Sequence, residues 1–146
     1  MTPATPFGRD AIESILPHRA PFLLLDEVVE MVPGERVAAT YRVPEDGWWF
    51  AGHFPERPVM PGVLIVEAMA QTGAVAVLAE EENRGRIAFF AGIDDCRFKR
   101  VVSPGETLSL VCEIDQVCGP IGRGKATAHV GSELAARGTL TFAVER

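Results

Sequence analysis

The sequence predicts an α+β domain in which about six antiparallel strands curl around one long helix. Three observations lead to this prediction. The chain has 146 residues, the size of one domain. One segment, residues 63–79, is apolar and compatible with a helix, and much of the remaining sequence has strand-like patterns between Gly and Pro turn signals. We therefore expect residues 1–146 to form a single domain.

The N-terminal part predicts a short helix followed by two strands. Apolar residues recur at helical spacing in residues 9–16, and a proline ends that pattern. Residues 21–43 then hold two apolar runs separated by a Pro-Gly turn signal at 33–34. Residues 47–62 interleave aromatic rings with three prolines, which predicts an ordered and stiff loop.

Residues 63–79 form the most distinctive segment, because nearly all of them are apolar. A membrane span is the first alternative, but the run is shorter than the roughly 20 apolar residues that a bilayer needs, and it contains Glu67 and Gln71. A helix of this kind must be covered on nearly every side. We expect no membrane insertion, and a curved sheet formed in part by strands at residues 87–101, 107–117, 124–130 and 134–144.

Composition and residue spacing exclude several classes of protein. A net charge of −6 argues against nucleic acid as a partner, because phosphate-backbone binding needs a basic face. The N-terminal sequence lacks the features of a signal peptide, and the three cysteines form no Cys-x-x-Cys pair, which favours the cytoplasm. The histidines His18, His53 and His129 lie far apart in the sequence, so we expect no metal site.

His53 is the first candidate catalytic residue. It lies in the sequence GHFP at the centre of the proline-rich loop, where stiff backbone holds it in place. Near neutral pH an imidazole takes up and returns a proton more readily than any other side chain. The alternative is a structural histidine that bonds a loop carbonyl.

Glu67 is the second candidate. Its neighbours on the predicted helix are apolar, so we expect a raised pKa for its carboxyl group unless a cation or strong donors meet it. Gln71, one helical turn further on, lies on the same face and is expected to donate a hydrogen bond to Glu67. Acidic side chains are rarely buried without a partner or a task, which favours a catalytic role. A half-exposed glutamate at a subunit boundary is the alternative.

The loop between the two candidates predicts a site shared by two chains. If its prolines hold the backbone extended, the segment from His53 to Gly62 spans up to roughly 28 Å, which puts Glu67 of the same chain out of reach. Two groups that transfer protons on one small substrate must both lie within hydrogen-bond distance of it. We therefore expect an obligate homodimer with composite sites, unless the loop doubles back.

The start of the predicted helix offers two backbone donors. The N–H groups of Gly62 and Val63 lie beside the positive end of the helix dipole, where they would polarise a carbonyl oxygen. Glycine also lets a ligand approach the backbone closely. A plain Pro-Gly helix start is the alternative.

A basic cluster formed by Arg97, Lys99 and Arg100 stands out in an otherwise acidic chain. Near the mouth of a pocket, such a cluster would attract an acidic carrier or a phosphate-bearing arm. The alternative is a solvated strand end.

Three motifs resemble one enzyme family. GHFPERPVMPGVLIVEAMAQ at residues 52–71 resembles the active-site segment of the 3-hydroxyacyl-acyl-carrier-protein dehydratases of the FabZ type. LPHRAPFLLLDEV at residues 16–28 and AGIDDCRFKRVVSPGETL at residues 91–108 match the same family in the expected order. The resemblance implies the hotdog fold, in which a curved antiparallel sheet wraps one long helix.

The resemblance also implies a reaction. It implies that His53 and Glu67 of opposite protomers dehydrate a 3-hydroxyacyl chain carried by acyl carrier protein in fatty acid biosynthesis, without a metal or redox cofactor. The Gly62 amide would bind the thioester oxygen, the basic cluster would steer the carrier, and the dimers would form a trimer of dimers. Glutamate at position 67, where FabA-type relatives carry aspartate, implies dehydration without isomerisation. The Trp48-Trp49-Phe50 segment departs from the family pattern, so we expect it to affect pocket shape or access.

Two other functions compete with this interpretation. A hotdog thioesterase would use a helix carboxylate with water to hydrolyse an acyl thioester, although the His53 loop argues against it. A non-catalytic acyl-binding module would use His53 and Glu67 only as structural polar groups.

Overall fold

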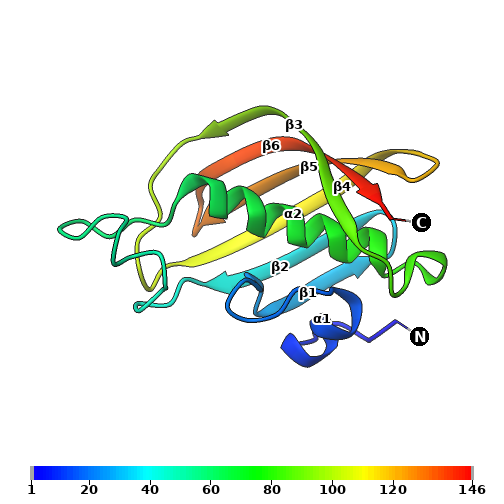
Figure 1. Ribbon diagram of the computed structural model, residues 1–146, viewed down its shortest axis with the longest axis horizontal. Helices are drawn as coiled ribbons and strands as arrows, with labels where there is room; N and C mark the ends of the chain where they lie inside the picture. The colour runs from blue at the N-terminus through cyan, green and yellow to red at the C-terminus, as the bar shows by residue number, and fades with distance from the viewer. Residues whose placement is uncertain (1, 146) are drawn as a thin grey trace.

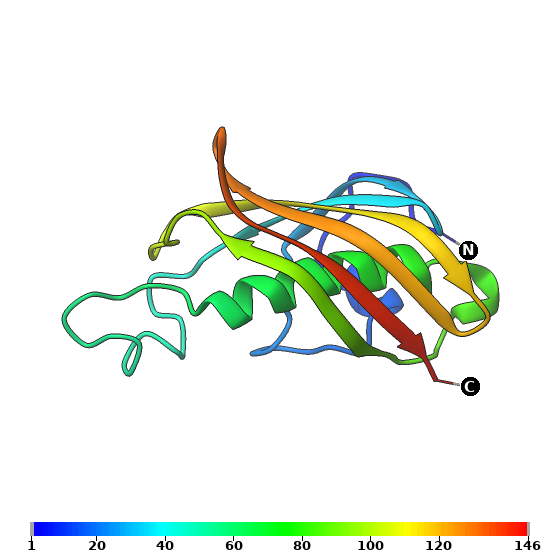
Figure 2. The same ribbon diagram turned by 90° about the horizontal axis from the view of Figure 1, so that it is seen from above.

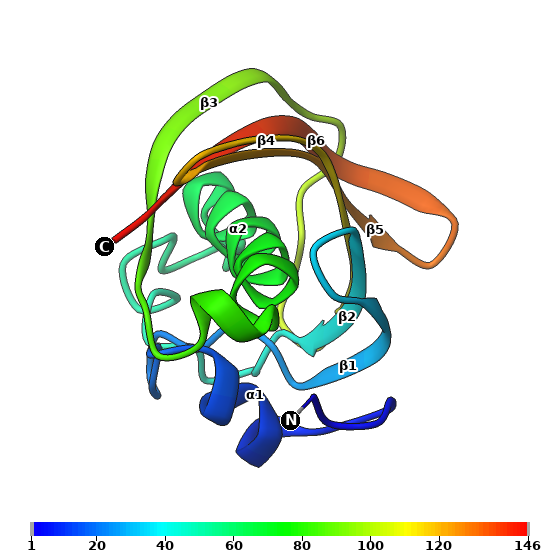
Figure 3. The same cartoon turned by 90° about the vertical axis from the view of Figure 1, so that its right-hand side faces the viewer.

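One antiparallel sheet wraps around helix α2 (Gly62–Leu78) in the computed structural model, which describes residues 2–145 (Figure 3). The sheet has six strands in the order β1-β2-β4-β5-β6-β3, which puts β1 and β3 at its edges (Figure 1). Their bounds are β1 (Glu27–Val32), β2 (Arg36–Arg42), β3 (Ala88–Phe98), β4 (Thr107–Cys118), β5 (Ile121–Val130) and β6 (Glu133–Val144). The predicted antiparallel sheet of about six strands is therefore confirmed.

The described chain contains two shorter helical segments in addition to the one long helix. Besides α2, which spans 17 residues, the described chain contains α1 (Arg9–Ile15) and a 3-10 turn, η1 (Glu81–Asn83). The short N-terminal helix agrees with the prediction at residues 9–16. One strand begins earlier than predicted: β5 starts at Ile121 rather than at residue 124, because the β4–β5 hairpin pairs Gly122 with Val117.

Helix α2 is buried on nearly every side, as its composition predicts. It packs against the inner face of the sheet, with β2, β4, β5 and β6 over it. The helix begins at Gly62 because Pro61 has an extended ψ of 134° and cannot continue the helix backward. Beyond its C-terminus, the Asn83 side chain donates a hydrogen bond to the carbonyl of Val77 at 3.1 Å. No helix within residues 2–145 has both the length and the apolar character to cross a membrane.

Gly73 sets how closely α2 approaches the sheet. A Cβ atom at this position would lie 2.5 Å from the Phe142 ring and 2.9 Å from Cys112 Sγ, both of them buried. We expect Gly73→Ala to lower the free energy of unfolding by about 1–3 kcal/mol, because overpacking outweighs the better helix propensity of alanine. Urea unfolding measures the change, with Gly52→Ala as control, because a Cβ at Gly52 meets no atom within 4 Å. A Gly73→Ala protein as stable as its parent would contradict this packing.

Strand β3 presents an apolar edge to solvent. Its exposed side chains include Phe89, Phe90, Ile93 and Phe98, and Val101 follows just after the strand. Among residues 2–145, β3 pairs only with β6, so its other edge carries unpaired backbone groups. An exposed apolar sheet edge of this kind is typical of a surface that another chain covers.

Candidate active site

His53 lies in the segment between β2 and α2, which extends past the end of the sheet (Figure 2). This loop doubles back instead of running extended. Phe54 and Arg57 exchange backbone hydrogen bonds of 3.2 and 3.1 Å, and the Val59 N–H donates to the His53 carbonyl at 3.1 Å. The condition of an extended loop, on which the expectation of a shared site rested, is therefore not met, because turn hydrogen bonds fold the proline-rich backbone back on itself. The length of the loop therefore does not by itself require a site shared by two chains.

The loop fixes which nitrogen of His53 can act as a base. Nδ1 lies 2.8 Å from the carbonyl oxygen of Val59. A carbonyl oxygen only accepts hydrogen bonds, so Nδ1 carries the proton in the neutral ring and Nε2 keeps its lone pair. The Phe54 ring stacks on the imidazole with centroids 4.1 Å apart. The half-buried imidazole is thus held from two sides, and within residues 2–145 no hydrogen bond engages its Nε2. The structural and catalytic interpretations of His53 are compatible.

Glu67 lies in a cavity of about 190 Å³ that opens between α2 and the end of the sheet formed by β3 and β6. Small residues make room on the helix side, and aromatic rings form the opposite wall. The lining comprises His18, Glu67, Ala70, Gln71, Ala74, Ala88, Phe89, Phe90 and Phe142. His53 of the same chain does not line this cavity.

The surroundings of Glu67 favour its protonated form. Burial raises the pKa of the Glu67 carboxyl group above its usual value, and the hydrogen bond from Gln71 offsets part of this rise. The carboxyl side chain is only 18% exposed, so desolvation of the anion outweighs that single donor. A carboxylic acid that keeps its proton to higher pH than an exposed glutamate is better suited to act as a general acid.

Gln71 is held so that its amide nitrogen faces Glu67. Its Oε1 accepts the Leu24 N–H at 2.8 Å, which identifies the other terminal atom as Nε2. Nε2 donates to the Phe22 carbonyl at 2.8 Å and to Glu67 Oε2 at 2.9 Å. The predicted Gln71–Glu67 hydrogen bond is present in the structure, and residues 22–24 fix its direction.

His18 also lies beside Glu67, which sequence reasoning misses. Its Nε2 approaches Glu67 Oε2 to 3.6 Å, and both side chains line the same cavity. The sequence places His18 in the LPHRAPFLLLDEV motif, but nothing in the local pattern distinguishes it from a surface histidine. Only the packing of residues 16–24 against α2 brings the two side chains together.

The first turn of α2 lies under an aromatic ring. A Cβ atom at Gly62 would lie 2.9 Å from the ring of Phe98, so glycine is needed for this contact. The N–H groups of Gly62 and Val63 have no acceptor within the helix, because the first turn provides none. Trp48 and Trp49 lie elsewhere, in a separate surface hollow lined also by Arg9, Tyr41 and Asp46. They do not form part of the Glu67 cavity.

The basic cluster separates into two parts. Arg97 and Lys99 are exposed on either side of Phe98, the residue that covers Gly62. Arg100 is half-buried, with its guanidinium 3.0 Å from Glu106 and 3.8 Å from Glu133. Its charge is therefore compensated within the chain, whereas the charges of Arg97 and Lys99 face solvent.

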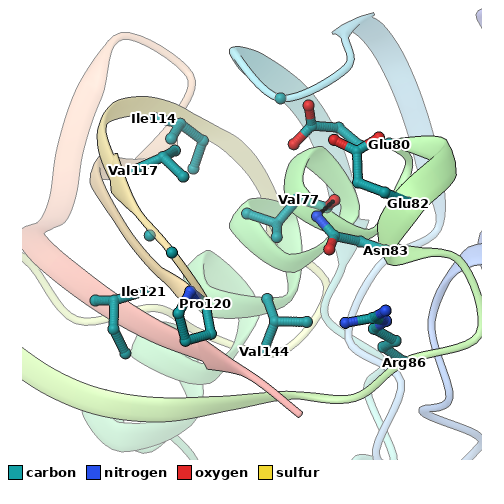
Figure 4. A pocket seen from close by; sticks show the side chains of 13 residues that line it. Val77, Glu80, Glu82, Asn83, Arg86, Ile114, Val117, Pro120, Ile121 and Val144 are labelled. Carbon is teal, nitrogen blue, oxygen red and sulfur yellow. Dashed lines mark hydrogen bonds between the residues drawn. The ribbon is translucent and has the colours of Figure 1, made fainter. Parts of the chain in front are cut away.

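A larger cavity, of about 390 Å³, lies at the opposite end of α2 (Figure 4). Glu80, Glu82, Asn83 and Arg86 line one side of it, and apolar side chains of β4, β5 and β6 line the other. None of the predicted catalytic residues contributes to it. Within residues 2–145, no three His, Cys, Asp or Glu side chains gather as metal ligands.

Comparison with known proteins identifies the family. A family model described as a FabA-like domain matches residues 16–139. The chain belongs to this FabA-like family. Two close relatives are the 3-hydroxyacyl-[acyl-carrier-protein] dehydratases FabZ of Staphylococcus aureus strains JH9 and Newman. Each is 57% identical over 141 residues, which is 97% of this chain and 97% of the relative. The resemblance carried by the three sequence motifs is therefore confirmed.

Solved structures support the same fold for this FabA-like chain. The dehydratase heterocomplex ApeI:P from Xenorhabdus doucetiae matches with a TM-score of 0.78 and 20% identity, over 92% of this chain and 91% of that chain. A sigma28-regulated virulence protein from Campylobacter jejuni matches with a TM-score of 0.71 and 14% identity, over 93% and 89%. With the family match, these similarities place the chain among the hotdog folds.

Proposed function

We propose that this protein is a 3-hydroxyacyl-acyl-carrier-protein dehydratase of fatty acid biosynthesis. It converts a (3R)-3-hydroxyacyl thioester into the trans-2-enoyl thioester by removing water across C2 and C3. The observation that carries the proposal is the carboxyl group of Glu67, whose pKa burial raises, in a cavity walled by alanine and phenylalanine side chains of a chain 57% identical to the Staphylococcus dehydratases. The three cysteines are free thiols, which fits the proposed cytoplasmic location.

The proposed mechanism assigns one task to each group. His53 Nε2 takes the C2 proton, and the electron pair of that C–H bond moves toward the thioester carbonyl. The N–H groups of Gly62 and Val63 stabilise the charge that develops on the thioester oxygen. Glu67 then gives its proton to the departing C3 hydroxyl, which leaves as water while the C2–C3 double bond forms. The steps move only protons and water, so they require no redox cofactor or metal.

We further propose that each site combines His53 of one protomer with Glu67 of its partner. The cavity beside Glu67 is lined by Phe89 and Phe90, which belong to the exposed apolar edge of β3. A second copy that covers this edge would also cover the cavity mouth. Its projecting His53 loop would then complete the site in a homodimer, and further association gives the trimer of dimers.

Turnover of a carrier-linked substrate tests the proposed reaction. We expect the protein to hydrate a crotonyl-carrier thioester reversibly to the 3-hydroxybutyryl thioester, with no loss of the acyl group from the carrier. Mass spectrometry of the carrier distinguishes the products. Release of free crotonic acid without hydration would indicate a thioesterase, and an unchanged thioester would indicate a binding module.

A charge-reversal variant tests the carrier surface. We expect Arg97→Glu with Lys99→Glu to lower kcat/KM for carrier-linked substrate about 10- to 100-fold, because both charges are exposed beside the covered start of α2. A short thioester mimic should be used almost normally. Arg100 is kept in this variant, because its loss would break the ion pair with Glu106. The control is Lys125→Glu, which reverses the charge of an exposed cation on β5. Equal losses on both substrates would contradict the assignment.

A further inference from the structure

His18 lies against Glu67 although the proposed mechanism gives it no task. Its Nε2 is 3.6 Å from Glu67 Oε2, and its side chain is 21% exposed. Its other nitrogen, Nδ1, is buried and has no hydrogen-bond partner among residues 2–145. The effect of this partly buried histidine on the proposed catalytic acid depends on which of its two ring nitrogens carries the proton.

The contacts favour one tautomer of His18. A proton on Nδ1 would leave a buried N–H group without an acceptor, and orphaned N–H groups are rare in folded proteins. A proton on Nε2 instead points toward Oε2 of the carboxyl group. The neutral ring is favoured because burial, and then the nearby charge of Arg19, lower the pKa of His18.

Glu67 Oε2 accepts the hydrogen bond from Gln71 and faces a second N–H group, that of His18, at 3.6 Å. The Gln71 amide donates to Oε2 at 2.9 Å, and its orientation is fixed because Leu24 occupies its oxygen. The His18 Nε2–H approaches the same oxygen from the segment that precedes Phe22 and Leu24. Because Oε2 accepts the Gln71 N–H, the proton of the protonated carboxyl group belongs on Oε1.

We propose that His18 is a positioning residue for Glu67: the Gln71 amide holds Oε2, and the His18 Nε2–H group, 3.6 Å away in the structure, closes to hydrogen-bond distance on the same oxygen, which leaves Oε1 to act on the substrate. This inference rests on the proposed function, because it assumes that Glu67 is the catalytic acid. The two titratable groups that line the cavity are His18 and Glu67 themselves. The lining from α2, β3 and β6 is otherwise neutral; Arg19, whose charge acts on His18, lies 3.8 Å from Glu13.

A matched pair of amide variants tests the role of His18. In His18→Gln the amide N–H reaches the place of Nε2, whereas in His18→Asn the side chain is one methylene too short. We expect His18→Asn to lower kcat about tenfold with KM changed less than about twofold, as expected when one orienting hydrogen bond is lost. His18→Gln should keep kcat within about threefold of the parent. Equal losses in the two variants would overturn the proposal.

The pH dependence separates positioning from a merely structural role. Loss of a donor to the carboxylate raises the pKa of Glu67, so the high-pH limb of kcat for dehydration of a 3-hydroxyacyl-carrier substrate should shift upward in His18→Asn and stay in place in His18→Gln. Carbon-13 NMR of protein labelled at the glutamate carboxyl carbons measures the same pKa without substrate, and Glu67→Gln identifies the signal. An unchanged Glu67 pKa in His18→Asn would overturn the proposal.

The NMR titration also keeps this proposal distinct from the proposed function. If the parent protein neither hydrates nor dehydrates a carrier-linked thioester, the proposed function fails. The Glu67 pKa still reports whether His18 donates to the carboxyl group. If the Glu67 pKa rises in His18→Asn but not in His18→Gln, the contact between His18 and Glu67 is supported even though the protein has another activity.

Discussion

Replacing His53 with asparagine is expected to lower kcat by about 10²- to 10⁴-fold, the range that a positioned general base contributes. The asparagine amide can still donate to the Val59 carbonyl, which His53 Nδ1 holds at 2.8 Å, so the loop should keep its shape. The variant removes Nε2, the nitrogen that keeps its lone pair, together with the ring that stacks on Phe54. Steady-state hydration of a crotonyl-carrier thioester measures the loss.

The matched control for this variant is His129→Asn. His129 lies on β5, where it is only partly buried, and it lines neither the Glu67 cavity nor the hollow beside Trp48. The same chemical change should leave kcat within about twofold there. Thermal unfolding of the His53→Asn protein should match the parent. Activity retained in a folded His53→Asn protein would remove His53 from the catalytic role.

The sheet and the buried helix are predictable because both follow from local patterns. Leu140, Phe142 and Val144 alternate with polar or small residues along β6, and all three are buried in the structure. The apolar run of α2 likewise predicts a helix that needs cover on nearly every side, and the curved sheet provides it. A hydrophobic pattern that repeats every two residues indicates a strand, and one that repeats every 3.6 residues indicates a helix. Both patterns can be recognised without knowledge of distant contacts.

The site is predictable only where residue type itself is unusual. Glu67 stands out because a carboxyl group is rare in an apolar helix, and His53 because it lies in a stiff loop. The contact between His18 and Glu67 depends on how residues 16–24 pack on α2, which no local pattern encodes. The compensation of Arg100 by Glu106 and Glu133 likewise appears only once β3, β6 and the β3–β4 connection lie together.

Replacing Glu67 with glutamine should cause a second large loss, again about 10²- to 10⁴-fold in kcat, because an amide cannot give up the proton that the departing hydroxyl needs. The shape of the side chain is kept, and Gln71 can still donate to its carbonyl oxygen. Glu27→Gln is the control, because Glu27 is an exposed carboxylate on β1. A folded Glu67→Gln protein with nearly full activity would contradict the acid role.

The pH dependence of kcat in the parent protein tests whether Glu67 acts in its protonated form. In the dehydration direction Glu67 must be protonated to act, so kcat for a 3-hydroxyacyl-carrier substrate should fall as pH rises through the pKa of Glu67. Because burial raises that pKa above its usual value, activity should persist to higher pH than an exposed glutamate would allow. The residual activity of Glu67→Gln should lack this limb. A parent profile that already falls at the pH where exposed glutamates ionise would contradict the assignment.

Mixing the two inactive proteins tests whether the site spans two protomers. In a heterodimer of His53→Asn and Glu67→Gln chains, one composite site carries both substitutions and the other carries neither. Random exchange in an equal mixture places half of the chains in heterodimers, so activity should recover to about a quarter of the parent value. A site within one chain would carry one substitution in every copy and recover nothing. Exchange must therefore be demonstrated independently, for example by native mass spectrometry of isotope-labelled chains, and absence of recovery after complete exchange would place both residues in one protomer.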